Sequence, residues 1–193
     1  MMNVLLVGHS FIRRLGYSID HSADLKTNFG LGINQCVVHF YGVSGGTLQK
    51  LKNDRNFIQN INSVRPSVII VQIGGNDLCS PCIRPEVFTC ELIEWIKSLQ
   101  EQFIFLKNVV ICELFIRRKP RFIDAQTYEI RRVIVNRMLK NMLEVQDNMV
   151  FWRHLRLMQS PMDILDKDGV HLSALGTKKF YRSLRLALLH AIR

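Results

Sequence analysis

Five short runs of apolar residues recur along the chain, and the segments between them carry apolar residues at a helical spacing instead. The runs lie at 3–7, 36–40, 67–73, 108–114 and 148–152. Three of them are unbroken and rich in Val, Ile and Leu, which is typical of strands in a parallel sheet covered on both faces. We therefore predict five buried strands.

Helices are predicted between these strands because apolar residues there recur three and four positions apart. One helix begins after Thr47 and buries Leu48, Leu51, Ile58 and Ile61. A second buries Phe88, Leu92, Trp95, Ile96, Leu99 and Phe103. A third buries Ile130, Ile134, Met138 and Met142. The last runs from about Leu172 to the C-terminus and buries Leu175, Phe180, Leu184 and Leu188.

Strand and helix alternate along the whole chain, and neither an internal repeat nor a Pro/Gly/Ser-rich linker interrupts them. A length of 193 residues fits one domain with a proper core, so we expect a single domain over 1–193. The alternation predicts an α/β fold with right-handed crossovers. We expect a three-layer α/β/α sandwich whose five-stranded parallel sheet has the flavodoxin-like order 2-1-3-4-5.

Positive charge is the unusual feature of the composition. Lys and Arg number 26 against 16 Asp and Glu, which gives a net charge of +10 and a pI near 9.7. Much of the excess lies within 117–140, where the candidate polyanion-binding residues are Arg117, Arg118, Lys119, Arg121, Arg131 and Arg132. Such a cluster attracts nucleic acid or anionic lipid, or else it is a solvated helix face beside a loop. The sequence leaves both interpretations open.

The chain carries no sign of export or of a membrane anchor. No run of 18 apolar residues is present, and the N-terminus lacks the cationic start and long apolar run of a signal peptide. The five cysteines are odd in number and show no disulfide framework, which fits a reducing compartment. We expect a cytoplasmic protein, with the nucleus as the alternative.

Candidate chemistry appears where the first three strands end. Gly8-His9-Ser10 follows the first, Ser44-Gly45-Gly46-Thr47 follows the second, and Gly74-Gly75-Asn76-Asp77 follows the third. In the order 2-1-3 these ends are neighbours on the ligand-binding rim of the sheet. Ser10 supplies a hydroxyl nucleophile, and the backbone N–H groups of Ser10 and Gly45 with the Asn76 amide supply oxyanion donors. This set is suited to acyl transfer.

A base for Ser10 appears near the C-terminal end, in Asp168-Gly169-Val170-His171. The D-x-x-H spacing lets the carboxylate orient the imidazole while its other nitrogen takes the serine proton. Asp163 and Asp166 are alternatives for the orienting acid. The segment 153–171 shows no clear element, and we expect it to carry His171 from the sheet edge to the rim.

These four segments resemble, in order, blocks I, II, III and V of the SGNH hydrolases, also called GDSL-type esterases. The blocks extend from residue 8 to residue 171 and thus span nearly the whole domain. The resemblance implies a flavodoxin-like fold and ester hydrolysis without a metal or another cofactor. It places the nucleophile on Ser10, the oxyanion donors on Ser10, Gly45 and Asn76, and the Asp–His pair on Asp168 and His171.

One position departs from the family pattern. The family usually has Asp directly before the nucleophile, where this chain has His9. The change alters hydrogen bonding around the Ser10 turn, so it bears on turnover rate and pH dependence. The opening segment 8–15 also resembles a divergent branch found in animal genomes, partly within retrotransposon-encoded proteins.

Three hypotheses follow for the function. The first is a serine esterase that hydrolyses a small-molecule carboxylic ester through an acyl-enzyme on Ser10. The second is a weakly active or inactive module that binds nucleic acid or another polyanion through its basic surface. The third is an enzyme for phosphorylated or acidic lipid esters, which would account for the charge and the triad together.

Overall fold

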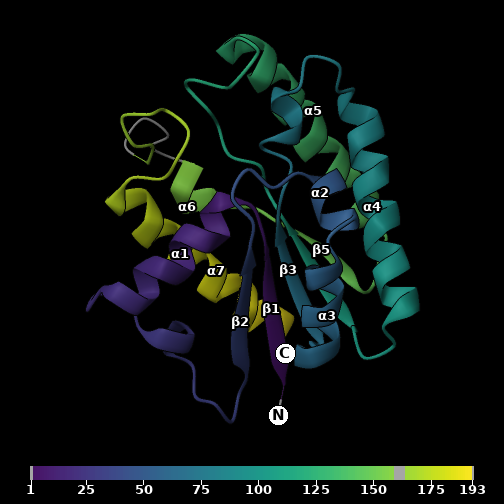
Figure 1. Cartoon of the computed structure of the whole chain (residues 1–193), viewed down its shortest axis with the longest axis vertical. Helices are drawn as coiled ribbons and strands as arrows, with labels where there is room; N and C mark the ends of the chain where they lie inside the picture. The colour runs from purple at the N-terminus through teal and green to yellow at the C-terminus, as the bar shows by residue number, and fades with distance from the viewer. Residues whose placement is uncertain (1, 159–163, 193) are drawn as a thin grey trace.

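A five-stranded parallel sheet forms the centre of the computed structural model, which describes residues 2–158 and 164–192 (Figure 1). The strands are β1 Asn3–Gly8, β2 Val37–Gly42, β3 Val68–Gln72, β4 Asn108–Cys112 and β5 Met149–Trp152. Their order is β2-β1-β3-β4-β5, and every neighbouring pair is parallel. The predicted strands and their order are confirmed.

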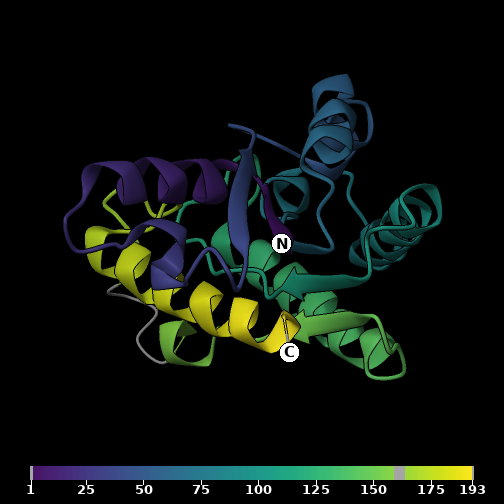
Figure 2. The same ribbon diagram turned by 90° about the horizontal axis from the view of Figure 1, so that it is seen from below.

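Helices cover both faces of this sheet (Figure 2). They are α1 Ser10–His21, α2 Leu48–Lys52, α3 Arg55–Val64, α4 Pro85–Gln102, α5 Ala125–Leu143, α6 Leu155–Met158 and α7 Ala174–Ala191. Short 3-10 turns lie at Thr27–Gly30 and Asp77–Cys79. In the described part of the chain, none of the helices combines the length and apolarity that crossing a bilayer requires.

The two faces of the sheet have separate cores. Leu5 and Val7 of β1 pack with α2, α3, α4 and α5, whereas Val4 and Leu6 pack with α1, α6 and α7. This follows from the strand itself, because successive side chains point to opposite faces. Both faces are therefore apolar, which is why the strands are unbroken apolar runs in the sequence.

The face that α5 buries differs from the predicted one. The buried stripe consists of Tyr128, Arg132, Val135, Asn136, Leu139 and Leu143. Of the predicted stripe, Ile130 is 55% exposed and Met142 is 36% exposed. Polar groups on the true inner face hide its periodicity, and each has a partner: Arg132 pairs with Glu129, and Tyr128 donates to the Phe115 carbonyl oxygen.

Two further helix predictions need correction. The helix expected after Thr47 is two helices, because Asp54 caps a new one by accepting a hydrogen bond from the Asn56 backbone N–H. Leu175, expected in the core, is 49% exposed. At that end of α7 the inward residue is Gly176, where a Cβ would lie 2.1 Å from the Ile164 carbonyl oxygen.

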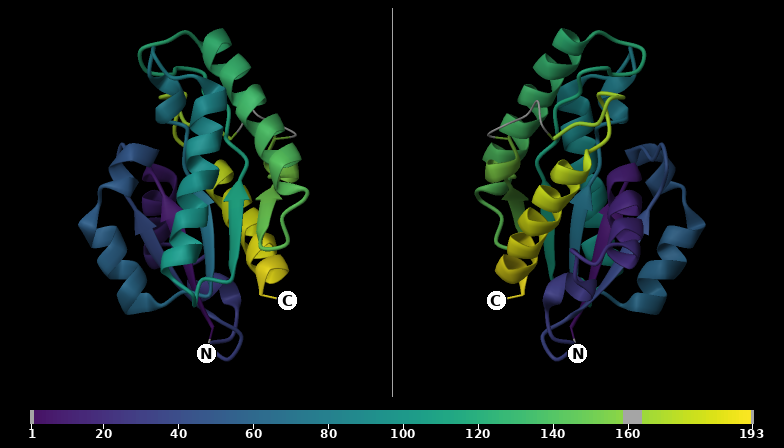
Figure 3. Two further views of the ribbon diagram at one scale, coloured as in Figure 1. Left: turned by 90° about the vertical axis from the view of Figure 1, so that its right-hand side faces the viewer. Right: turned by 90° about the vertical axis from the view of Figure 1, so that its left-hand side faces the viewer.

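Both chain ends lie at the edge of the sheet opposite to the turns that follow β1 and β3 (Figures 1 and 3). Those turns, together with residues 164–173, form the rim described next. The segment from residue 164 to α7 lies at this same end of the sheet, opposite to the chain ends (Figures 1 and 3).

Candidate active site

Backbone contacts hold the three predicted turns together. The Val43 N–H donates to the Gly8 carbonyl oxygen at 2.9 Å, which joins the turn after β2 to the end of β1. The Asn76 side-chain amide donates to the Gly46 carbonyl oxygen at 2.8 Å, which joins the turn after β3 to the same place. The Gly46 backbone also packs on His9, since a Cβ there would lie 3.5 Å from the His9 Cα.

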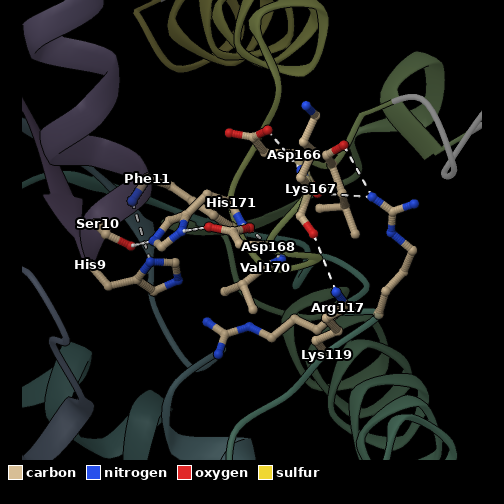
Figure 4. Close-up of polar contacts among 12 residues, drawn as sticks. His9, Ser10, Phe11, Arg117, Lys119, Asp166, Lys167, Asp168, Val170 and His171 are labelled. Atoms are coloured by element: carbon tan, nitrogen blue, oxygen red, sulfur yellow. Dashed lines mark hydrogen bonds and ion pairs between the residues drawn. The ribbon is translucent and has the colours of Figure 1, made fainter.

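Ser10 is the first residue of α1, directly after β1. The helix is capped by His9, whose Nδ1 accepts a hydrogen bond from the Phe11 N–H at 3.4 Å. This start of the helix turns the Ser10 hydroxyl toward the rim (Figure 4). There the Ser10 Oγ lies 3.2 Å from Nε2 of His171, although the two residues are 161 positions apart in the chain.

The imidazole of His171 is oriented by Asp168. Its Nδ1 lies 2.6 Å from Oδ2 of Asp168, so the ring donates from Nδ1 and accepts from Ser10 at Nε2 (Figure 4). The other oxygen, Oδ1, accepts from the backbone N–H groups of Val170 and His171 at 2.9 and 2.8 Å. Partial burial opposes the charge of Asp168, but these hydrogen bonds outweigh it and hold the pKa of Asp168 well below its ordinary value.

The loop that carries this pair is docked on the chain after β4. The Arg118 N–H donates to the Gly169 carbonyl oxygen at 2.7 Å, and the Asp166 N–H donates to the His171 carbonyl oxygen at 2.8 Å. Gly169 has a φ of 68°, and a Cβ there would lie 3.1 Å from the Arg118 Cβ. A side chain at this position would therefore be strained and crowded.

Of the alternative acids, Asp166 bonds His171 through its backbone only: its side-chain Oδ1 accepts from the backbone N–H of Lys167 at 2.7 Å. Asp163 lies outside the described residues. Asp168 is therefore the acid that the described structure places against the imidazole.

Hydrogen-bond donors without an acceptor are present at Ser10 and in the turns after β2 and β3. No acceptor is present for the backbone N–H of Ser10 or of Gly45 among the described residues. Gly45 has a φ of 63°, a conformation that favours glycine. The Asn76 amide uses one of its two hydrogens on Gly46 and keeps the other. Donors of this kind are what the negative oxygen of a tetrahedral intermediate requires.

Arg117 belongs to this site, so the prediction that it is a surface residue is wrong. Its side chain is only 7% exposed. One guanidinium nitrogen donates to Oδ1 of Asn76 at 2.9 Å, and the other lies 3.2 Å from the sulfur of Cys79. The sequence did not predict this role, because Arg117 is the first residue of a basic run and such runs are usually exposed. The one unusual feature that pointed to this place was His9, which lies near Arg117 in the structure.

His9 is a neutral residue at this position. It is 1% exposed, and burial, followed by the positive charge of Arg117 and the proximity of His171, lowers the pKa of His9 to about 3. Its Nδ1 is the helix-capping acceptor, so the hydrogen is on Nε2. Where the family usually has a carboxylate, this chain thus places an uncharged ring beside a guanidinium (Figure 4).

Most of the other candidate polyanion-binding residues also make internal contacts. Arg118 donates to the carbonyl oxygens of Leu165 and Asp166, and Lys119 to that of Lys167. Arg131 donates to carbonyl oxygens of the segment after the Asn76 turn. Arg132 is buried, contrary to prediction, and pairs with Glu129. Arg121 lies over the Phe122 ring. Polyanion binding stays a prediction, resting on fewer free charges than the sequence indicated.

The arrangement combines a hydroxyl, a base held by a carboxylate, and unpaired N–H donors. In residues 2–158 and 164–192, no three His, Cys, Asp or Glu side chains come together as a metal site requires. The arrangement is chemically suited to nucleophilic attack by Ser10 on a carbonyl carbon.

A comparison with protein families agrees with this chemistry. The family profile described as GDSL-like Lipase/Acylhydrolase matches residues 7–184. The chain belongs to this family. The matched range contains all of Ser10, Gly45, Asn76, Asp168 and His171, and it ends within α7. No curated protein matches the chain in sequence.

Solved structures share the fold of this GDSL-like chain at low sequence identity. A GDSL-like lipase from Bacteroides thetaiotaomicron has a TM-score of 0.72 and 16% identity, over 98% of this chain and 88% of that one. An acetyl esterase mutant with an acetate ion has a TM-score of 0.67 and 16% identity, over 100% and 98%. An acetylxylan esterase from Geobacillus stearothermophilus, in a catalytic mutant, has a TM-score of 0.64 and 13% identity, over 97% and 94%.

Proposed function

We propose that this GDSL-like protein hydrolyses carboxylic esters through an acyl-enzyme on Ser10. The observation that carries the proposal is the continuous hydrogen-bonded line from Ser10 to His171 to Asp168, with distances of 3.2 and 2.6 Å. Family membership and the fold shared with esterases support a hydrolase, and this line of contacts supports serine chemistry.

In the proposed reaction, His171 removes the Ser10 proton at Nε2 while the Ser10 oxygen attacks the ester carbonyl carbon. The negative charge that develops on the carbonyl oxygen is stabilised by the N–H groups of Ser10 and Gly45 and by the Asn76 amide. Asp168 stabilises the imidazolium that forms. His171 then gives its proton to the leaving alcohol, and water, activated by the same ring, releases the acid from Ser10.

The nucleophile assignment can be tested with a fluorophosphonate probe, which reacts with activated serines. We expect the probe to label the wild-type protein at Ser10, as mapped by peptide mass spectrometry, and to leave Ser10→Ala unlabelled. Ser173, the helix-capping serine of α7, provides a matched control: Ser173→Ala should keep the label on Ser10. Label on another residue, or none on folded protein, would overturn the proposal.

A further inference from the structure

Three basic side chains contact the turns after β2 and β3, which hold Gly45 and Asn76. Arg117 donates to Oδ1 of Asn76 at 2.9 Å. The Lys50 Nζ, from α2, lies 3.1 Å from the carbonyl oxygen of Gly45. Arg13, from α1, donates to the hydroxyl of Ser44 at 2.7 Å. Cations from three separate segments thus contact the two turns that adjoin the end of β1.

None of these three cations is neutralised by an ion pair. In the described part of the chain, no carboxylate oxygen lies within 4.0 Å of their nitrogens. Each donates to a neutral oxygen or sulfur instead, so each keeps its full charge. Lys50 and Arg13 are exposed, so they are free to turn toward a bound molecule.

Two carboxylates lie near these cations. Asp168 accepts from His171 and from two backbone N–H groups. Asp77 is 8% exposed, and its Oδ1 accepts from the Leu48 N–H, whereas its Oδ2 has no hydrogen-bond partner among the described residues. Burial raises the pKa of Asp77 to about 6, and the charge of Arg117 opposes that rise. His9, next to Ser10, is neutral. The three cations therefore outnumber the two carboxylates at this rim.

We infer that the ester substrate carries a negatively charged group, such as a carboxylate or a phosphate, close to its reacting carbonyl. The inference rests on the proposed function and names the substrate class of the same site. Cations without counter-ions raise the local concentration of an anionic substrate and stabilise it when it is bound. A neutral ester would make no use of the exposed charges of Arg13 and Lys50.

The experiment compares matched pairs of esters on one enzyme. The first pair is 4-nitrophenyl acetate and 5-acetoxy-2-nitrobenzoate, which have the same nitrophenol leaving group with and without a carboxylate. The second pair is mono-4-nitrophenyl adipate and its methyl ester, which place the charge on the acyl side. At low salt we expect kcat/KM to be at least about 10-fold higher for the anionic member of one pair, and the ratio to fall in 0.5 M NaCl. Which pair responds shows on which side of the ester the charge binds.

Variants link the preference to the three cations. Lys50→Met and Arg13→Gln should each lower the anionic-to-neutral ratio by about 2- to 5-fold, as expected for an exposed charge pair. His9→Asp should lower it as well, because it places a carboxylate beside Arg117. The exposed Arg182 of α7, which lines a groove with β5, is the matched control: Arg182→Gln should leave the ratio unchanged. Because both esters of a pair are measured on the same protein, a general loss of activity or of folded protein cancels from the anionic-to-neutral ratio.

The outcomes separate this inference from the proposed function. Hydrolysis of all four esters with ratios near 1, or ratios that Lys50→Met and Arg13→Gln leave unchanged, would overturn the anionic-substrate inference and leave the esterase standing. Folded protein that hydrolyses none of the esters and takes no label on Ser10 would overturn the proposed function itself.

Discussion

At the scale of single residues, the distribution of hydrogen bonds around Asp168 explains how a short loop can hold the proposed base, His171. One oxygen of the carboxylate binds the imidazole of His171, and the other binds the backbone of the same loop. The carboxylate therefore fixes the ring and the turn that carries it with one side chain.

Removing the imidazole tests the role of the base. His171→Ala should lower kcat for 4-nitrophenyl acetate by roughly 10³-fold or more, because its imidazole is the group hydrogen-bonded to the Ser10 hydroxyl. Asp168→Asn should cost less, since an amide oxygen can still accept from the loop backbone. Circular dichroism should show both variants folded. Equal rates for wild type and His171→Ala would exclude the base assignment.

Asn76 and Arg117 allow a second test at this scale. Asn76→Ala should lower kcat by about 10²- to 10³-fold with little change in KM, because the amide acts mainly on the charge that develops in the transition state. Arg117→Met should have a smaller effect, about 10-fold, because Gly46 still holds the amide.

Steady-state kinetics with a neutral ester separates these roles. A change confined to KM in Asn76→Ala would make Asn76 a substrate-binding residue rather than an oxyanion donor. Full activity in Arg117→Met would show that Arg117 does not position the amide.

At the scale of elements, a buried histidine joins two strands and a helix. His154, just after β5, is 0% exposed; its Nε2 donates to Gln72 of β3 at 3.2 Å, and its Nδ1 accepts from Ser183 of α7 at 2.7 Å. Burial lowers the pKa of His154 to about 3. This network ties the last helix, and with it the end of the His171 loop, to the sheet.

The lowered pKa has a consequence for stability. The folded state binds the proton of His154 more weakly than the unfolded chain does, so the stabilisation is present above about pH 6.5 and is lost as the pH falls toward 3. Between pH 6 and pH 4.5, the free energy of unfolding should therefore fall more steeply for wild type than for His154→Gln. The difference in slope should be about 1 kcal/mol per pH unit.

Urea unfolding at several pH values measures that slope. His190→Gln is the matched control, because His190 is exposed in the folded protein. A pH dependence that is the same in His154→Gln and wild type would contradict the assignment. His9, whose pKa is also about 3, contributes a parallel loss in all three proteins and cancels from the comparison.

The elements also show why sequence reasoning succeeded in some places and failed in others. The strands were predictable because burial on both faces leaves unbroken apolar runs. The inner face of α5 was not predictable, because its buried positions include the polar residues Arg132 and Asn136. Arg132 bonds Glu129, one helical turn away, and Asn136 accepts from the Leu114 N–H, which is distant in the sequence. The D-x-x-H loop was predictable from spacing, whereas the place of Arg117 depends on contacts with the turn after β3.

At the scale of the whole molecule, the net charge of +10 remains the feature that bears on partners. Internal contacts engage most of the basic residues in 117–140, which leaves Arg121 and Arg137 among the exposed ones without an ion pair in the described structure. A surface of this kind binds polyanions through general attraction and counter-ion release rather than through base recognition.

We expect weak, sequence-independent binding to single-stranded RNA that is lost as salt rises from about 50 to 200 mM. Arg121→Gln with Arg137→Gln should reduce the dependence of log Kd on log salt by about 1 to 2 units and leave ester hydrolysis unchanged. Fluorescence anisotropy at several salt concentrations measures both effects. Absence of binding at low salt would show that the excess positive charge does not bind single-stranded RNA.

The 161-residue separation between Ser10 and His171 has a consequence for the making of the protein. A ribosome releases Ser10 and the first strand well before the loop with Asp168 and His171 and the helix α7. Until that loop has emerged, the Ser10 hydroxyl lacks its proposed base and is an ordinary alcohol. We therefore expect a nascent chain without this loop to stay unacylated at Ser10.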